Sequence, residues 1–180
     1  CTFVTVPGKL RSQGKGMFFG HARVGQNGRA FRCLKFRTMV PDAEQRLRDL
    51  LERDAMARLQ WQTSHKLDND PRITRLGHFL RRTSLDELPQ LWNVIRGDMS
   101  LVGPRPVTAA ELVERYRDSA VAYMAVRPGL TGPWQVSGRN NISYEERVRI
   151  DRSYAISHSL GLDMTILART VLVVLGANGK

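Results

Sequence analysis

The sequence predicts an α+β fold: a mostly helical single domain with a small β-hairpin near the N-terminus. Residues 17–24 and 30–38 have the composition of strands, and Gln26-Asn27-Gly28 between them is a strong hairpin signal. Beyond residue 41, apolar residues recur at helical spacing instead. With 180 residues, of which 42% are hydrophobic, the chain is long enough to bury its own core.

The helical part is expected to contain several amphipathic segments. Periodicity places them at about residues 43–62, 73–80, 88–95, 108–125, 143–158 and 162–175. Thr108 with Glu111, and Ser143 with Glu146, have capping-box spacing and are expected to begin two of these helices. The last segment could dock on the core or lie on a membrane surface, and core packing is the commoner outcome for such a helix.

Two loops are expected to be ordered and functional. The glycine-rich segment 127–140 is long, and Trp134 and Val136 can anchor it, so its glycines could let backbone amides approach a phosphate. Residues 103–106, Gly-Pro-Arg-Pro, form a stiff loop that can fix Arg105 in place.

The most informative stretch covers residues 84–106. Helical spacing within it predicts a helix that ends near Gly97 and has one buried apolar stripe, formed by Leu88, Leu91, Trp92 and Ile95. Asp86 and Glu87 then lie in the first turn. A structural explanation is that Ser84 and Glu87 form a capping box and that Asp86 gains from the helix dipole.

A functional explanation for the same carboxylates rests on their neighbours. Pro89 constrains the first turn, and arginines flank the pair at Arg72, Arg75, Arg81, Arg82, Arg96 and Arg105. We therefore expect a depressed pKa for Asp86 and a phosphate-binding environment around it. On the second strand, Lys35 and Arg37 are two residues apart and share one face.

The composition limits the partners. A net charge of +11 favours an anionic partner, which could be nucleic acid, an acidic membrane surface or a phosphorylated small molecule. Aromatic residues make up 7% of the chain and show no stacking pattern typical of single-strand binders. The two cysteines and four histidines lack metal-ligand spacing, and no apolar run is long enough to span a membrane.

Several motifs, taken together and in order, closely resemble the bacterial sugar transferase family. They lie at residues 35–39, 70–74, 84–91, 97–100, 103–106, 127–129 and 135–140. The family comprises the monotopic polyprenyl-phosphate phosphoglycosyl transferases. Details at residues 20–25, at Cys33 and in the helix after Pro41 are most similar to the undecaprenyl-phosphate galactose phosphotransferase branch.

This resemblance implies a reaction and a cofactor. The expected activity is transfer of sugar 1-phosphate, from a UDP-hexose such as UDP-galactose or UDP-glucose, to undecaprenyl phosphate with release of UMP. Such a step begins exopolysaccharide, O-antigen or capsule synthesis. Asp86 matches the family nucleophile, which forms an aspartyl-phosphosugar intermediate, and Glu87 matches the residue that helps to hold Mg²⁺. Physically, a carboxylate attacks a phosphoryl group only where cations neutralise the facing negative charge.

The resemblance also assigns further site residues. Positions expected to contact diphosphate, nucleotide or lipid phosphate are Lys35, Arg37, Arg81, Arg105, Arg127 and Arg139. Asp151 resembles another acidic site position, beside the metal or the sugar, although an exposed helical carboxylate explains it equally well.

The implied location is the cytoplasmic face of the bacterial inner membrane. Residues 1–16 are expected to be a linker or entry arm that follows a membrane-embedded helix, and residues 17–180 the catalytic domain. Whether the protein forms a homodimer is left open by the sequence. No nucleic-acid partner is expected.

Two alternatives from other classes remain at the level of sequence. A nucleic-acid-binding module would bind in a salt-dependent way that survives Asp86→Asn, but two acidic residues in the most basic neighbourhood argue against it. A non-catalytic membrane-surface scaffold would bind liposomes without binding nucleotide sugar.

Overall fold

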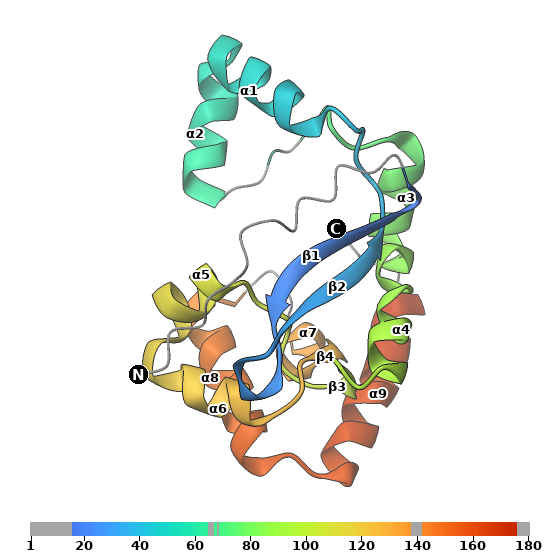
Figure 1. Cartoon of the computed structure of the whole chain (residues 1–180), viewed down its shortest axis with the longest axis vertical. Coiled ribbons are helices and arrows are strands. Elements are labelled where there is room, and N and C mark those ends of the chain that lie inside the picture. The colour runs from blue at the N-terminus through green and yellow to red at the C-terminus, as the bar shows by residue number, and fades with distance from the viewer. Residues whose placement is uncertain (1–15, 65–66, 68, 138–141, 176–180) are drawn as a thin grey trace.

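The computed structural model describes residues 16–64, 67, 69–137 and 142–175. An antiparallel ribbon of β1 (Phe18–Val24) and β2 (Ala30–Phe36) crosses its centre (Figure 1). The strands are joined through a short 3-10 turn, η1 (Gln26–Gly28), in which Asn27 adopts φ 56°, a conformation that asparagine tolerates. The prediction of a small hairpin in an α+β fold is confirmed.

Helices flank this ribbon on two sides (Figure 1). Along one side run α3 (Arg75–Arg82), the 3-10 turn η2 (Leu85–Glu87) and α4 (Gln90–Ile95). The other side holds α5 (Ala109–Glu111), the π-helical turn η3 (Leu112–Tyr116), the 3-10 turn η4 (Arg117–Ser119), α6 (Ala120–Ala125) and α8 (Tyr144–Ser157). Thr108 and Ser143 cap α5 and α8 as expected, each accepting a hydrogen bond from the backbone amide three residues later.

A second, parallel strand pair, β3 (Ser100–Val102) with β4 (Gly129–Thr131), packs against α9 (Leu160–Leu175), which in turn contacts α7 (Pro133–Val136). The sequence did not predict this sheet. A Cβ at Gly129 would overlap the Gly103 backbone, and one at Gly132 would overlap the Gly103 carbonyl. These glycines therefore permit close contact between two backbone segments, and the expected approach of their amides to a phosphate stays a prediction.

The expected long helix after Pro41 is instead two helices, α1 (Ala43–Arg53) and α2 (Ala55–Ser64). Asp54 between them is extended, and its side-chain Oδ1 accepts hydrogen bonds from the amides of Met56 and Ala57. This capping begins a new helix and breaks the old one. The pair projects from one end of the molecule (Figure 1).

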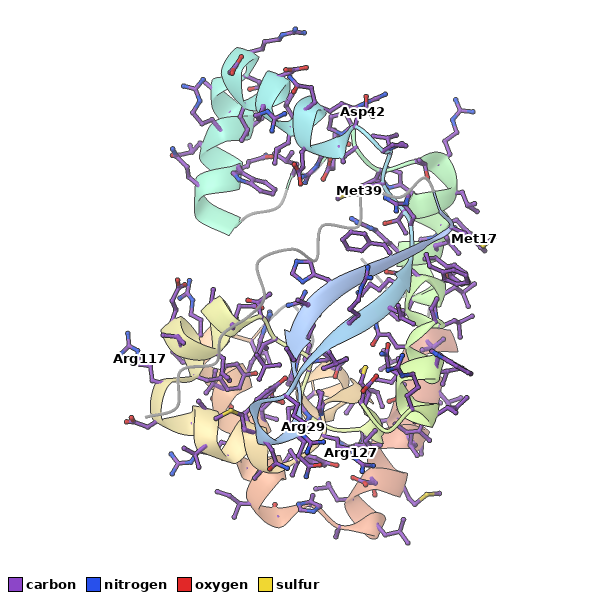
Figure 2. The ribbon with its side chains drawn as sticks, in the orientation of Figure 1. Met17, Arg29, Met39, Asp42, Arg117 and Arg127 are labelled. Carbon is purple, nitrogen blue, oxygen red and sulfur yellow. The ribbon has the colours of Figure 1, made fainter. Side chains whose placement is uncertain are left out.

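The expected helix over residues 108–125 is also interrupted. Arg117 adopts φ 45° and ψ −118°, and the chain passes from π-helical to 3-10 geometry at this residue before α6 begins. Arg117 projects from the edge of the molecule (Figure 2). Periodicity alone cannot reveal such a break, because the apolar spacing continues across it.

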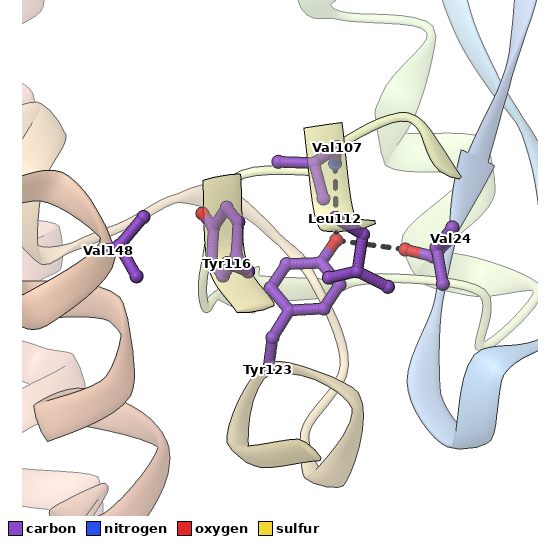
Figure 3. Packing of buried hydrophobic residues seen from close by; sticks show 6 residues of the cluster. All are labelled: Val24, Val107, Leu112, Tyr116, Tyr123 and Val148. Atoms are coloured by element: carbon purple, nitrogen blue, oxygen red, sulfur yellow. Dashed lines mark hydrogen bonds between the residues drawn. The ribbon is translucent and has the colours of Figure 1, made fainter. Parts of the chain in front are cut away.

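The principal core lies between β1, η3, α6 and α8 (Figure 3). Its buried members are Val24, Val107, Leu112, Tyr116, Tyr123 and Val148. The Tyr123 hydroxyl donates to the Val24 carbonyl at 2.9 Å and accepts from the Val107 amide at 3.2 Å. One buried phenol thus ties the end of β1 to the segment that leads into α5.

The apolar stripe predicted for the central helix is exposed, which is the reverse of the expectation. Its members, Leu88, Leu91, Trp92 and Ile95, are 40–75% exposed. The buried residues of α4 are Gln90 and Asn93. Asn93 accepts from the Leu34 amide and donates to the Arg32 carbonyl. Because α4 packs against the open edge of β2, it must bury a hydrogen-bonding side chain rather than an apolar one.

Helix α9 docks on the second sheet, as the commoner outcome predicted. Ile166 is buried with Val102 and Tyr154, while Leu160 and Leu172 on other faces stay exposed. Among the described residues, no helix has both the length and the apolar character needed to cross a membrane.

Candidate active site

A cavity of about 1190 Å³ runs from the first turn of α1, past β2 and η2, to β4, α7 and the last turns of α9. It brings together six of the residues predicted to form the site, namely Lys35, Arg37, Arg81, Asp86, Glu87 and Arg105. These residues come from segments far apart in the sequence, so the cavity exists only in the folded chain.

The carboxylates lie on η2, not in the first turn of a continuous helix. Ser84 adopts φ 58°, and its side chain makes no capping hydrogen bond to η2. The predicted capping box at Ser84 and Glu87 is therefore wrong, because Ser84 has left-handed geometry rather than the extended backbone of an N-cap residue. Pro89 precedes α4 directly and separates it from η2. The structural explanation for the carboxylate pair thus loses its main support.

Lys35 is the direct partner of both carboxylates. Its Nζ donates to Glu87 Oε1 at 2.6 Å and lies 3.9 Å from Asp86 Oδ2. The Asp86 side chain is 12% exposed, whereas those of Lys35 and Glu87 are close to 30% exposed. The position of Lys35 depends on Asn93, which clamps the neighbouring residue of β2, Leu34, to α4. Asn93 was missed by sequence reasoning, because only its contact with the strand edge gives it a role.

Burial raises the pKa of the Asp86 carboxyl, although Lys35 and Arg81 act to lower it and Glu87 adds to the rise. The expectation of a depressed pKa is therefore wrong. The nearby cations can be read from the sequence, but the burial of the carboxyl cannot. Burial is the largest influence on the pKa of Asp86. An additional cation beside Asp86 would favour its ionised form.

Three of the predicted arginines, Arg37, Arg81 and Arg105, also line the cavity. Arg81 donates from Nε to the Thr38 hydroxyl at 2.9 Å, and Asp86 is its largest electrostatic partner. Thr38 is buried, and sequence reasoning did not assign it a role. The Arg105 guanidinium lies over the Trp134 ring at 5.9 Å from the centroid, so the stiff loop and a buried aromatic hold this cation as expected. Arg37 is anchored through a 2.8 Å bond to the Gly16 carbonyl.

The remaining predicted residues lie elsewhere. Arg127 is exposed and does not line the cavity; it lies at the opposite end of the molecule from Met39 and Asp42 (Figure 2). Arg139 falls outside the described residues. The proposed contacts of both residues with phosphate stay predictions.

Asp151 is fully buried on α8, so the alternative of an exposed helical carboxylate is wrong. It accepts a 2.7 Å hydrogen bond from the Tyr116 hydroxyl, and its Oδ1 has no hydrogen-bond partner among the described residues. Burial raises the pKa of Asp151 to about 7. It does not line the cavity, and its role beside a metal or sugar stays a prediction.

The donor set in the cavity suits a hard divalent cation only in part. Across the described residues, no group of three or more His, Cys, Asp or Glu side chains is placed to hold a metal. Asp86 and Glu87 supply carboxylate oxygens, and Mg²⁺ commonly binds through one or two carboxylates together with water and substrate phosphates. The residues therefore fit a magnesium ion that arrives with a phosphorylated ligand.

The fold and the cavity define a class of protein: an α+β domain in which a pair of carboxylates faces several cations in one cavity. Residues 1–177 match the family described as Bacterial sugar transferase. The chain belongs to this family, which confirms the resemblance in its motifs.

Known relatives extend the comparison. The chain is 56% identical over 166 residues to the UDP-galactose-lipid carrier transferase of Erwinia amylovora, covering 92% of this chain and 35% of that protein. It is 50% identical over 171 residues to the undecaprenyl-phosphate galactose phosphotransferase of Salmonella typhimurium, covering 95% and 36%. It is 47% identical over 179 residues to the exopolysaccharide production protein ExoY of Sinorhizobium fredii, covering 99% and 79%. The chain thus spans about a third of the length of the first two relatives.

Proposed function

We propose that this chain is the catalytic part of a phosphotransferase that moves hexose 1-phosphate from a UDP-hexose to undecaprenyl phosphate and releases UMP. The observation that carries the proposal is the Asp86-Glu87 pair, which faces Lys35 and Arg81 in one cavity. The names of two relatives support it, since both include galactose and a lipid carrier or undecaprenyl phosphate. Galactose is therefore the first donor sugar to test.

In the first step, an oxygen of Asp86 attacks the phosphorus that carries the sugar. The bond from this phosphorus to the bridging oxygen breaks, and UMP leaves with that oxygen. An aspartyl-phosphosugar remains on the protein. Lys35 and Arg81 lie beside Asp86 and offset the negative charge of the approaching diphosphate.

In the second step, a phosphate oxygen of undecaprenyl phosphate attacks the same phosphorus. The acyl phosphate bond breaks, the Asp86 carboxylate is regenerated, and the product carries the sugar on a diphosphate-linked lipid. Arg105 lines the same cavity and would neutralise the second phosphate.

Glu87 would hold Mg²⁺ together with the diphosphate, and the ion when bound would supply charge neutralisation for the transferring group. Lys35 donates to Glu87 in this structure, so a substrate phosphate that draws Lys35 away would free a Glu87 oxygen. In this scheme Glu87 would therefore pair with Lys35 before substrate binds and with Mg²⁺ afterwards.

The cytoplasmic membrane surface of a bacterial cell is the proposed location. The exposed apolar side chains of α4 would sit among the lipid tails, while the basic residues Arg82 and Arg96 would face anionic headgroups. This arrangement would bring the nucleotide from the water side and the lipid phosphate from the membrane side. Residues 1–16 are proposed to be a linker or entry arm that follows a membrane-embedded segment, and residues 17–180 to form the catalytic domain.

The test is release of UMP from UDP-galactose in the presence of Mg²⁺ and undecaprenyl phosphate. Asp86→Asn is expected to abolish release, while Asp118→Asn, a change at an exposed residue on η4, is expected to leave it unchanged. Full turnover by Asp86→Asn would overturn the proposal.

A further inference from the structure

The cavity has a second wall that the phosphate chemistry does not use. This wall comes from β3, β4, α7 and the end of α9, and its aliphatic members are Leu101, Leu130, Val136, Leu167, Val173 and Val174. The wall shares one continuous cavity with Asp86, Lys35 and Arg81. An aliphatic surface and a cluster of cations therefore border the same space.

The two hydroxyl groups that line this wall, those of Thr131 and Thr170, are already satisfied, whereas Gln135 Oε1 on α7 is buried without a hydrogen-bond partner among the described residues. Thr170 Oγ1 donates to the Ile166 carbonyl at 2.8 Å, so its hydrogen is used within α9. The 2.8 Å contact between Thr131 Oγ1 and Thr170 Oγ1 then requires Thr131 to be the donor. Neither hydroxyl keeps a hydrogen for a ligand. A sugar or a nucleobase, which needs several hydrogen bonds to leave water, would gain little from these two hydroxyls.

The aliphatic wall also reaches the outside of the molecule. Leu101 and Val174 line the cavity and are still 45% and 43% exposed. A hydrocarbon chain can therefore lie against the wall near Asp86 and leave the cavity over the apolar side chains of Leu101 and Val174.

We propose that this wall is the subsite for the first isoprene units of a polyprenyl phosphate, whose phosphate lies against Lys35, Arg81 and Arg105. The inference rests on the proposed function, because it assigns the acceptor lipid of that reaction to one wall of the cavity. Charge complementarity favours this occupant: an anionic head joined directly to a hydrocarbon chain matches both walls at once.

The test uses equilibrium binding, so it needs neither donor nor turnover. Farnesyl phosphate, kept below its micellar concentration, and inorganic phosphate are titrated into the chain by calorimetry. Farnesyl phosphate is expected to bind at least about tenfold more tightly, since several buried methylene groups each contribute to binding. Leu130→Gln on β4 and Val174→Gln on α9 are each expected to reduce that ratio at least about threefold.

The matched control is Leu172→Gln, on the same helix as Val174 but not among the cavity-lining residues. It is expected to keep the wild-type ratio. Equal affinities of the wild type for the two ligands would overturn the subsite, and so would an equal loss in Leu172→Gln. Thermal unfolding of each variant separates a lost subsite from a lost fold.

Release of UMP from UDP-galactose, measured on the same samples, distinguishes a failure of the subsite from a failure of the proposed transferase activity. Release without a preference for farnesyl phosphate would overturn the subsite alone. A preference without release would support the subsite and contradict the proposed transferase activity.

Discussion

Lys35 has an unusual position, since a single ammonium group serves two carboxylates. It bonds Glu87 at 2.6 Å and lies 3.9 Å from Asp86, in a site partly shielded from water. In such surroundings an ammonium group interacts with anions more strongly than on an open surface. The same residue can stabilise the unliganded site and then accept a substrate phosphate.

Lys35→Met is expected to lower kcat/KM for UMP release by about 100-fold, because the diphosphate would meet two carboxylates with less opposing charge. Lys35→Arg should recover part of this loss by restoring the cation. Steady-state kinetics with UDP-galactose measure the effect. A change of less than twofold in Lys35→Met would show that the ammonium group is not needed in the reaction.

Asp151 predicts a pH dependence of stability. Its pKa is about 7 in the folded protein and near 3.8 when unperturbed. The folded state therefore holds its proton over a pH range in which the unfolded state has lost it. The contribution to stability is fully present below about pH 4 and declines as the pH rises to 7, by a total of about 4 kcal/mol.

Asp151→Asn should flatten this decline, because asparagine carries no titrating proton and can still accept the hydrogen bond from Tyr116. Urea unfolding at several pH values between 5 and 8 measures the free energy of unfolding for both proteins. Parallel pH profiles would mean that another group is responsible.

At the scale of elements, α4 and its surroundings illustrate what periodicity cannot decide. The spacing of Leu88, Leu91, Trp92 and Ile95 correctly indicated one apolar face, but the choice of which face is buried depends on the neighbouring element. The neighbour here is a strand edge, which needs the Asn93 amide. The apolar face therefore remains exposed on the surface.

This exposed face gives a prediction about membranes. Ile95→Glu should weaken binding to anionic vesicles, because it places a charge in the apolar face, and it should change the free energy of unfolding by less than about 0.5 kcal/mol. Val113→Glu on η3 is the matched control, since both side chains are 75% exposed. Vesicle co-sedimentation measures the bound fraction of each variant. An equal loss of binding in both variants would contradict the proposed contact of α4 with the membrane.

The close contact of Gly103 with Gly129 holds the second sheet together. Gly129→Ala is expected to destabilise the fold by about 2 kcal/mol or more, because its Cβ would overlap the backbone of the partner segment. Gly161→Ala near the start of α9 is the control: nothing lies within 4 Å of its Cβ, so it should be neutral or slightly stabilising. Thermal unfolding compares the two, and equal melting temperatures would contradict the close-contact role.

For the whole molecule, the fold class, the hairpin and the clustering of Lys35, Arg81, Asp86 and Glu87 followed from the sequence. Local patterns and family motifs carry this information. The break at Asp54, the parallel β3–β4 pair and the buried state of Asp151 did not follow, because each depends on contacts between distant segments. The raised pKa of Asp86 belongs with them, since burial is a property of the assembled chain.

The net charge of +11 is also a property of the whole chain. Some of its basic residues line the cavity and others lie on the surface. Lys35, Arg81 and Arg105 line the cavity, while Arg82 and Arg96 are exposed at the C-terminal ends of α3 and α4. The proposed phosphate site and the proposed membrane face together give a use for these basic residues.

The central claim is that Asp86 becomes covalently attached to a sugar phosphate. Intact-protein and peptide mass spectrometry after brief incubation with UDP-galactose and Mg²⁺, without lipid acceptor, tests it most directly. The account predicts a mass increase equal to hexose phosphate less water on the peptide that contains Asp86, and its loss on adding undecaprenyl phosphate. Release of UMP with no adduct on that peptide, or an adduct on another residue, would contradict it.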